Sequence, residues 1–572
     1  MKESVHKPAS RFRIGTILVI VLLVPMALMV RAFELHVINK DFLQGQGDAR
    51  SIRELPVAAH RGMIMDRHGE PLAVSTPVDS IVADPRRFEV TPTQLANLAN
   101  VLDLKPQKIS ALVNKKKKAN KSFTYLKRRV IPSQAKKVTE LKIPGISLRR
   151  EYRRYYPTGE VTAHIIGFTD VDDRGQEGIE LGYQQWLKGE KGRQLVMTDN
   201  LGRVVNYIDL IKPPRAGQDL VLSLDRRLQY LTYRELKRAV FKHKAKSGSA
   251  VILDVQTGEV LAMVNQPSFN PNNRSSLKGY RYRNRVVTDT FEPGSTVKPF
   301  TIIAALESGK FSASSTIDTS PGYLKVSGSI IKDIRNYGRI SLSTVISKSS
   351  NVGASKLALA IKPDNLVKLH RRIGFGDLTQ SGLSGEVEGS INHPRVWRDI
   401  ERATLSYGYG LSVTTLQLAR AYSVLASDGK LKPVSIELQS GPVEGEQIIS
   451  AKYAAQVRKM LMAAVSEGGT GTKATVPGYH VAGKTGTVKK VGKHGYSDNK
   501  YISTFVGMAP ANNPRLVMAI TIHEPRGEHY YGGEVAAPVF SNVMAGALRL
   551  LDVAPDVLPE NQSTFALLGG LK

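Results

Sequence analysis

Residues 291–298 read FEPGSTVK, and this stretch places Ser295 and Lys298 in the pattern Ser-x-x-Lys. Two further short motifs follow along the chain, first Ser349-Ser350-Asn351 and then Lys484-Thr485-Gly486-Thr487. Each motif alone recurs by chance in a long sequence. The three in this order are typical of a site that transfers an acyl group through a serine and a lysine, without a histidine.

The residues around Ser295 predict a helix. Pro293-Gly294 predicts a turn that opens this helix, which should end near Gly309. Lys298 then lies one turn beyond Ser295 on the same face. A serine hydroxyl is a weak nucleophile that needs a base, and a lysine serves only when burial or a positive neighbour lowers its pKa. Lys484 is the candidate neighbour.

The other two motifs supply groups for a proton relay and for binding. The hydroxyl of Ser349 can relay a proton, and the amide of Asn351 can hold a substrate carbonyl or orient the lysine. The β-branched residues around Lys484 predict an edge strand, where Lys484 and Thr485 can bind a substrate carboxylate. Gly486 lets a substrate backbone approach closely. The candidate oxyanion-hole donors are the backbone N–H groups of Ser295 and Thr487.

Residues 478–485 also fit the phosphate-binding pattern G-x-x-x-x-G-K-T. That loop needs a strand before its first glycine and a helix that starts at its lysine. Here residues 476–478 predict a turn, residues 479–482 predict a strand, and Gly486 and Gly492 lie where the helix should run. We therefore reject nucleotide binding. The histidines show no metal-ligand spacing, so no metal or other cofactor is predicted.

Residues 14–30 are 17 consecutive uncharged, mostly apolar residues. As a helix they span roughly 25 Å, and an extension to residue 35 reaches across a bilayer core. The basic residues Lys2, Lys7, Arg11 and Arg13 precede them and favour a cytoplasmic N-terminus. A cleaved signal peptide is the alternative, but the run is long and no clear cleavage site follows it. We expect a cytoplasmic tail over 1–13 and a single membrane anchor over 14–35.

Hairpins and helices alternate in the rest of the chain, which predicts an α+β fold with an antiparallel sheet flanked by helices. The domain boundary is placed just before Asp225, giving an N-terminal domain over 36–224, a C-terminal domain over 225–555 and a tail over 556–572. The expected elements are strands at 63–65 and 219–224, a helix at 225–242, hairpins at 250–264 and 505–522, and a final helix at 538–551.

Charged residues and glycines also cluster between the anchor and Asp225. Residues 66–69 predict a turn in which Gly69 takes a positive φ. Further clusters run from Arg154 to Gly159 and from Gly175 to Glu180. We expect these polar side chains to form salt bridges at a domain junction rather than to catalyse a reaction.

The net charge of +30 is concentrated, because residues 105–154 contain 17 basic and two acidic side chains. A binder of nucleic acid or of an anionic surface would carry such a segment, but we favour the interpretation of a solvated basic face. Aromatic residues are sparse there, so nucleic-acid binding is not predicted. Lysine-rich, helix-favouring sequence runs from the turn at residues 66–69 to about residue 141. The chain has no cysteine, which excludes disulfides and thiolate chemistry.

With these motifs the chain resembles the class B penicillin-binding proteins, in particular the division-specific (septal) peptidoglycan D,D-transpeptidases of Gram-negative bacteria. The resemblance also rests on longer runs, at residues 61–69, 154–159, 175–180, 284–299, 407–410 and 530–533. It implies a single transmembrane helix, an elongated N-terminal pedestal domain and a C-terminal penicillin-binding transpeptidase domain.

The resemblance implies that Ser295 attacks the D-Ala-D-Ala bond of a stem peptide, releases D-Ala and passes the acyl group to a neighbouring stem. Lys298 would be the general base, Ser349 the proton relay and Asn351 a ligand of the substrate amide. Carboxylate binding falls to Lys484, Thr485 and Thr487, and the cleft would be lined by Tyr407, Tyr530 and Tyr531.

The implied partners are peptidoglycan stem peptides and glycan derived from a lipid-linked precursor, β-lactams, a membrane glycan polymerase, other division proteins and the inner membrane. The catalytic domain would lie in the periplasm at the division site.

Several alternatives stay open. An elongation-type transpeptidase would carry the same motifs. A carboxypeptidase or β-lactamase would let water replace the acceptor amine. A non-enzymatic β-lactam sensor or division scaffold is also conceivable, but a sensor needs a cytoplasmic effector domain and only 13 residues precede the apolar run.

Overall fold

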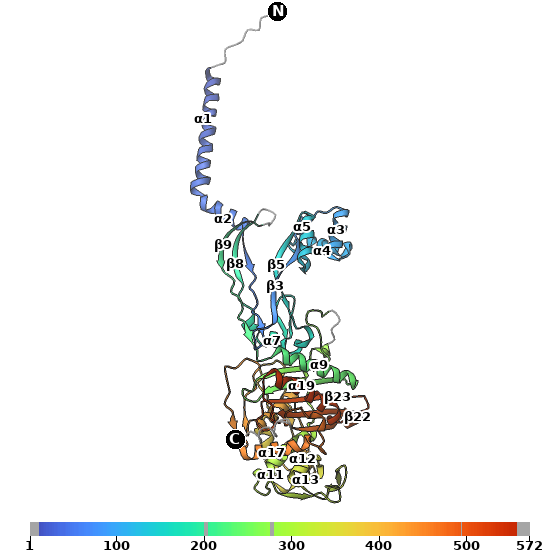
Figure 1. Ribbon diagram of the computed structural model, residues 1–572. Helices are drawn as coiled ribbons and strands as arrows, with labels where there is room; N and C mark the ends of the chain where they lie inside the picture. Colours follow the sequence, from blue (N-terminus) through green and yellow to red (C-terminus); the bar gives the residue numbers. More distant parts are fainter. Residues whose placement is uncertain (1–10, 199–203, 275–278, 493–494, 558–572) are drawn as a thin grey trace, which may run out of the picture. The chain divides into compact units, whose positions relative to one another are not determined.

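The computed structural model describes residues 11–198, 204–274, 279–492 and 495–557 (Figure 1). Residues 1–10 of the expected cytoplasmic tail, with Lys2 and Lys7, and residues 558–572 of the expected C-terminal tail lie outside the described residues. The smaller of two compact units comprises Met1–His60, Pro77–Tyr152 and Gly189–Ala216, and the larger comprises Arg61–Thr76, Arg153–Lys188 and Gly217–Lys572. The domain bounds drawn from the sequence stay a prediction.

The smaller unit begins with helix α1 (Arg11–Phe33), which continues through a π-helical turn (Glu34–Ile38) before α2 (Lys40–Ser51). Within the described residues, Arg11–Ile38 is the one helix long and apolar enough to cross a membrane, by length and composition. Its large apolar side chains are exposed, as expected of a helix whose partner is lipid. This helix fits the predicted anchor and begins three residues earlier than expected.

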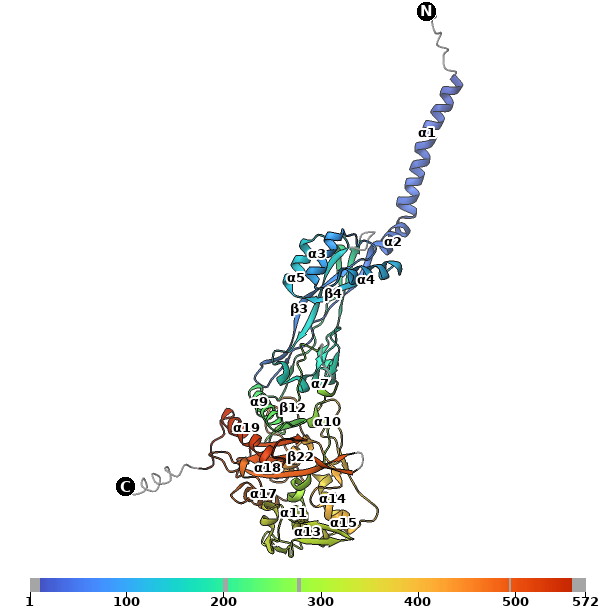
Figure 2. The ribbon, with the colours of Figure 1, turned by 90° about the vertical axis from the view of Figure 1, so that its right-hand side faces the viewer.

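The rest of the smaller unit contains an antiparallel sheet and a helical head (Figure 2). The sheet is formed by β1 (Ile52–Val57), β8 (Gly192–Thr198) and β9 (Val204–Lys212). In the head, α3 (Pro92–Leu102), α4 (Pro106–Lys118) and α5 (Pro132–Glu140) pack around buried residues such as Leu98, Ile109 and Val113.

The expectation of helix between about residue 70 and residue 141 is wrong in two places, because residues 71–83 and 124–130 form strands. Strand β4 (Thr124–Val130) interrupts the helices of the head and pairs with residues 79–83 of β3 (Pro71–Ala83). Thr124, Leu126 and Val130 are buried while the lysine and arginines between them are partly exposed. Pairing with a strand distant in sequence therefore overrides the helical preference of the basic residues.

The larger unit is built on a five-stranded antiparallel sheet in the order β12-β11-β23-β22-β21. The first hairpin, β11 (Ser247–Asp254) and β12 (Val260–Gln266), is confirmed, as is the second, β22 (Gly495–Ala509) and β23 (Leu516–His523). Strand β21 (Ala482–Gly492) lies at the edge, as the sequence predicts for Lys484.

Helices cover both faces of this sheet, which confirms the α+β class (Figure 1). On one face lie α9 (Arg226–Lys242) and α19 (Ala537–Leu550). On the other lie α11 (Lys298–Glu307), α16 (Thr415–Ala426) and α17 (Ala451–Val465). The carboxylate of Asp225 caps α9 by accepting from the N–H of Arg227 at 2.9 Å. The strand expected at 219–224 is shorter, with β10 covering only Leu220–Val221.

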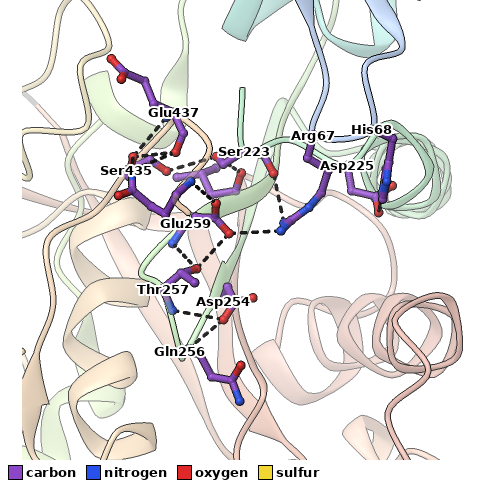
Figure 3. A network of polar contacts seen from close by, with 12 residues as sticks. Arg67, His68, Ser223, Asp225, Asp254, Gln256, Thr257, Glu259, Ser435 and Glu437 are labelled. Carbon is purple, nitrogen blue, oxygen red and sulfur yellow. Dashed lines mark hydrogen bonds and ion pairs between the residues drawn. The ribbon is translucent and has the colours of Figure 1, made fainter. Parts of the chain in front are cut away.

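The turn at residues 66–69 is confirmed, with Gly69 at a φ of 79°. Figure 3 shows how this turn is tied to the hairpin between β11 and β12. Arg67 donates to Glu259 at 3.3 Å and to the carbonyl oxygen of Ser223 at 3.4 Å. Glu259 also accepts from the N–H of Gln439 at 2.7 Å. The buried carboxylate therefore connects three segments that are distant in sequence.

Glu180 accepts from the Nε atoms of Arg61 at 2.7 Å and Arg154 at 2.6 Å. All three side chains are buried. The expected salt bridges are present, but they do not lie at the expected junction between domains. They join three chain segments within the larger unit, because Arg61, Arg154 and Glu180 all belong to it.

Replacing Glu180 by Gln should destabilise the larger unit, because it leaves two buried guanidinium groups without a counter-charge. We expect a loss of about 3–5 kcal/mol, seen as a lower melting temperature in scanning calorimetry of the detergent-solubilised chain. The control is Arg193→Ala, which breaks an exposed ion pair with Glu54 and should cost at most about 1 kcal/mol. An unchanged melting temperature in Glu180→Gln would contradict this role.

Candidate active site

Ser295 lies in a 3₁₀ turn (Gly294–Val297), and α11 begins only at Lys298. The helix expected from Ser295 is confirmed as far as its end, but its first turn is wound more tightly than an α-helix. The N–H of Lys298 donates to the carbonyl oxygen of Ser295. This tight turn sets Lys298 on the buried side, while Ser295 stays half-buried.

Two glycines allow this turn to form. Gly294 has a φ of 56°, and a Cβ atom there would lie 2.4 Å from Cγ1 of Val488. Its N–H donates to the carbonyl oxygen of Gly408 at 3.2 Å. A Cβ atom on Gly408, whose φ is 89°, would lie 2.2 Å from the carbonyl oxygen of Gly294. No larger residue fits at either position without displacing the turn that carries Ser295.

Ser349 lies between α12 (Leu342–Ser347) and α13 (Asn351–Ala360) with a φ of 58°. A left-handed conformation costs a residue with a Cβ atom about 1–2 kcal/mol, so its surroundings must hold it there. Ser350 caps α13 by accepting from the N–H of Gly353 at 2.8 Å. The cap fixes the start of α13 and with it the position of Asn351.

The carboxylate of Asp333 holds this loop, and the sequence motifs did not reveal it. It accepts from the hydroxyl of Ser350 at 2.5 Å and from the N–H groups of Asn351 at 2.6 Å and Val352 at 3.0 Å. Asp333 precedes Ser349 by 16 residues and belongs to no recurring pattern, so only the folded chain places it here.

The side chains of Lys298 and Lys484 meet at Ser349. Nζ of Lys298 lies 3.1 Å from Oγ of Ser349, 2.5 Å from its carbonyl oxygen and 2.8 Å from Oδ1 of Asn351. Nζ of Lys484 also lies 3.1 Å from Oγ of Ser349, and 3.1 Å from the carbonyl oxygen of Thr485. One serine hydroxyl therefore bridges two lysine nitrogens.

Burial lowers the pKa of both lysines, which have no exposed surface. Burial holds the pKa of Lys298 well below its ordinary value, the charge of Lys484 lowers this pKa further, and Asp333 raises it. Burial lowers the pKa of Lys484 to about 7. The influence of Lys484 on Lys298 expected from the sequence is therefore present. The Ser295 hydroxyl makes no hydrogen bond to the part of the chain that the structure describes.

The edge strand carries the third motif. The hydroxyl of Thr485 donates to that of Thr470 at 2.9 Å, and Oγ1 of Thr487 accepts from the N–H of Gly532 at 2.9 Å. A Cβ atom on Gly486 would lie 3.0 Å from the carbonyl oxygen of Pro293. Lys484 lies within β21 rather than at the start of a helix, so the rejection of a phosphate-binding loop is confirmed.

The predicted tyrosines lie outside this lysine network. Tyr530 stacks between Tyr501 and Tyr531, with ring centroids 4.1 and 4.5 Å away. Tyr407 packs edge-on against Tyr409 at 5.5 Å, and burial raises the pKa of Tyr407 to about 12. The structure therefore joins Lys298, Ser349, Asn351, Lys484 and Thr485 in one network, while the tyrosines form two separate aromatic groups.

Comparison with known proteins agrees with this geometry. The penicillin binding protein transpeptidase domain matches residues 248–545, which contain all three motifs. The penicillin-binding protein dimerisation domain matches residues 56–222. The chain belongs to the class B penicillin-binding proteins. The resemblance inferred from the sequence is thus confirmed, together with the two-part architecture that it implied.

Relatives of this class B penicillin-binding protein match it over nearly its whole length. The chain is 45% identical to the peptidoglycan D,D-transpeptidase FtsI of Escherichia coli, over 97% of this chain and 95% of that protein. It is 43% identical to the probable peptidoglycan D,D-transpeptidase PbpC of Pseudomonas aeruginosa, over 96% of this chain and 97% of that protein.

Solved structures agree as well. The transpeptidase domain of penicillin-binding protein 3 from Burkholderia pseudomallei is 43% identical, with a TM-score of 0.55 over 59% of this chain and 98% of that chain. A peptidoglycan synthetase from Bifidobacterium adolescentis is 25% identical, with a TM-score of 0.68 over 89% of this chain and 98% of that chain. The second structure shows that the fold extends beyond the transpeptidase domain.

Gly408→Ala should destabilise the protein more than Gly410→Ala. Both glycines have a positive φ, but a Cβ atom on Gly410 meets nothing within 4 Å. Both variants should therefore lose about 1 kcal/mol for the backbone conformation. Gly408→Ala should lose about 1–3 kcal/mol more for the clash with Gly294. Thermal unfolding of the two variants measures the difference, and equal melting temperatures would refute the close contact.

Proposed function

We propose that this class B penicillin-binding protein is a peptidoglycan D,D-transpeptidase that cross-links stem peptides during septal cell-wall synthesis. The observation that carries the proposal is the hydroxyl of Ser349, which lies 3.1 Å from the nitrogens of both Lys298 and Lys484. This arrangement supplies a proton relay beside a lysine whose pKa is strongly lowered. The relatives from Escherichia coli and Pseudomonas aeruginosa, named as D,D-transpeptidases, support the same reaction.

In the first half-reaction, neutral Lys298 accepts the proton of the Ser295 hydroxyl. Oγ of Ser295 then bonds to the carbonyl carbon between the two D-Ala residues of the donor stem. The N–H groups of Ser295 and Thr487 receive the developing oxyanion, and each such donor contributes about 3–4 kcal/mol in other serine enzymes. Lys484, Thr485 and Thr487 bind the terminal carboxylate, next to the glycine that lets the substrate backbone approach.

The peptide bond between the D-Ala residues then breaks. Its nitrogen takes a proton through Ser349, and D-Ala leaves as an amine while Ser295 carries the acyl group as an ester. In the second half-reaction the amine of a neighbouring stem attacks this ester. The bond to Oγ of Ser295 breaks, the serine regains its proton, and a cross-link has formed. Asn351 binds the substrate amide, and Tyr407, Tyr530 and Tyr531 line the cleft.

The anchor sets where this reaction takes place. The apolar helix α1, with Arg11 and Arg13 at its start, supports a single-pass inner-membrane protein with a cytoplasmic N-terminus. The pedestal (36–224) and the transpeptidase domain (225–555) then lie in the periplasm at the division site. There the enzyme meets glycan made from the lipid-linked precursor by a membrane glycan polymerase, together with other division proteins.

Ser295→Ala should abolish covalent labelling by a fluorescent penicillin, because the β-lactam carbonyl would have no oxygen to bond with. The label is measured on a denaturing gel after incubation of the full chain in detergent. Ser320→Ala, in an exposed loop, is the matched control and should label like the wild type. Persistent labelling of Ser295→Ala would disprove the nucleophile assignment.

The acid limb of acylation should shift in opposite directions in two variants. Acylation needs neutral Lys298, so its rate falls as the pH drops through the pKa of that lysine. Asp333 raises this pKa and Lys484 lowers it. The acid limb of Asp333→Asn should therefore move to lower pH. The acid limb of the residual activity of Lys484→Met should move to higher pH.

Stopped-flow acylation by a fluorescent penicillin across pH gives both profiles. Asp364→Asn, which changes an exposed carboxylate in the first turn of α14 (Pro363–Arg372), is the control and should leave the profile unchanged. A shift of both variants in the same direction would rule out Lys298 as the titrating base.

A further inference from the structure

The basic head, defined as residues 105–152, carries a charge that the proposed reaction does not use. It contains 15 basic and two acidic side chains. One of the two acidic side chains, Glu151, is already paired within the head. Its carboxylate accepts from Arg128 at 2.9 Å and from the hydroxyl of Tyr125 at 2.6 Å. Glu140 is the other acid of the segment, and Asp79 from outside it pairs with Arg150 at 2.8 Å, so the basic side chains of the head still far outnumber the acidic ones.

The cations gather most densely at the end of α4. This helix turns Ile109 and Val113 into the core of the head, and its last turn is Lys115–Lys118. Lys115, Lys117 and Lys118 are exposed, as is Lys121 just beyond the helix. Within the described residues these four side chains make no hydrogen bond or ion pair. They are therefore available to a ligand outside the chain.

Apolar side chains are exposed on the same head. Phe123 is 41% exposed, Ile131 55% and Leu148 41%. The guanidinium group of Arg149 lies over the ring of Phe123 at 5.4 Å. Cations combined with exposed apolar side chains are typical of surfaces that rest at the lipid–water boundary, where the cations meet phosphates and the apolar groups enter the edge of the acyl region.

The composition of the basic head and its link to the anchor limit the class of ligand that it can bind. Sparse aromatic residues argue against single-stranded nucleic acid. The apolar helix α1 belongs to the same compact unit as the basic head. A segment tethered to a bilayer meets phospholipid head groups at a high effective concentration, so weak contacts to each head group are enough for binding. We propose that the basic head binds the anionic phospholipid surface of the membrane in which the chain is anchored.

Electrostatic attraction would make the largest contribution to this contact. Each lysine near an anionic surface strengthens binding about five-fold at moderate salt, and the effect fades within a Debye length. Neutralising Lys115–Lys118 should therefore weaken head–membrane association by more than about 100-fold. A mutation here should leave covalent penicillin labelling unchanged, because none of these lysines belongs to the catalytic network.

The absence of cysteine allows a direct test on the full chain. A Ser122→Cys substitution creates a single labelling site in an exposed loop of the head. The labelled protein is reconstituted in nanodiscs of phosphatidylcholine alone or with phosphatidylglycerol, each carrying a head-group acceptor dye. We expect greater energy transfer in the anionic nanodiscs and its loss at high salt. Glutamine at all four positions 115–118 should abolish the lipid dependence, and arginine there should retain it.

The matched control removes the same charge elsewhere, by glutamine at the exposed positions Lys362, Lys368, Lys452 and Lys459 of the larger unit. It should keep the full energy transfer. Equal transfer in neutral and anionic nanodiscs would overturn the proposal. An increase in energy transfer only after a lipid-linked pyrophosphate precursor or an acidic protein partner is added would also overturn it. In that case the basic head binds that ligand instead of the phospholipid surface. Penicillin labelling of each variant shows that the transpeptidase domain is folded.

Discussion

The site depends on two buried lysine side chains that share one serine hydroxyl, that of Ser349. Two ammonium groups so placed would each lose their hydration and repel one another, which is why burial and mutual repulsion depress the pKa of Lys298. The resulting neutral amine can accept a proton, which a solvated lysine near neutral pH cannot do. The elements around the site therefore have to bury the two lysine side chains and keep their nitrogens beside the same oxygen.

The fold meets this requirement by bringing together three separate elements. The 3₁₀ turn before α11 presents Ser295, the loop before α13 presents Ser349, and the edge strand β21 presents Lys484. The first two are held by contacts from distant segments, namely the backbone of Gly408 against Gly294 and the carboxylate of Asp333 on the loop. The hydrogen bonds of Asp333 offset the strain of Ser349, and its charge partly opposes the depression of the lysine pKa.

The sequence predicted those features that depend on local patterns. The order of the motifs, the hairpins and the edge strand followed from residue types and spacing, and the structure confirms them. The features it did not predict depend on contacts between distant segments. Asp333 acts through a loop 16 residues further on, Gly408 is required because another backbone passes close to it, and β4 forms by pairing with β3 although its basic residues favour helix. The tight turn at Ser295 was also missed, because Pro-Gly predicts a turn but not its winding.

Lysine residues occur in two different settings in this chain, and exposure to solvent distinguishes them. Lys298 and Lys484 have no exposed surface, and their lowered pKa values suit them to proton transfer and to binding one carboxylate. Lys115, Lys117 and Lys118 are exposed and unpaired among the described residues, so they suit a surface of many phosphates. The net charge of +30 therefore does not distinguish the buried lysines from the exposed ones. The sequence locates both sets of lysines, but only the fold shows which set is buried and which lies on the surface.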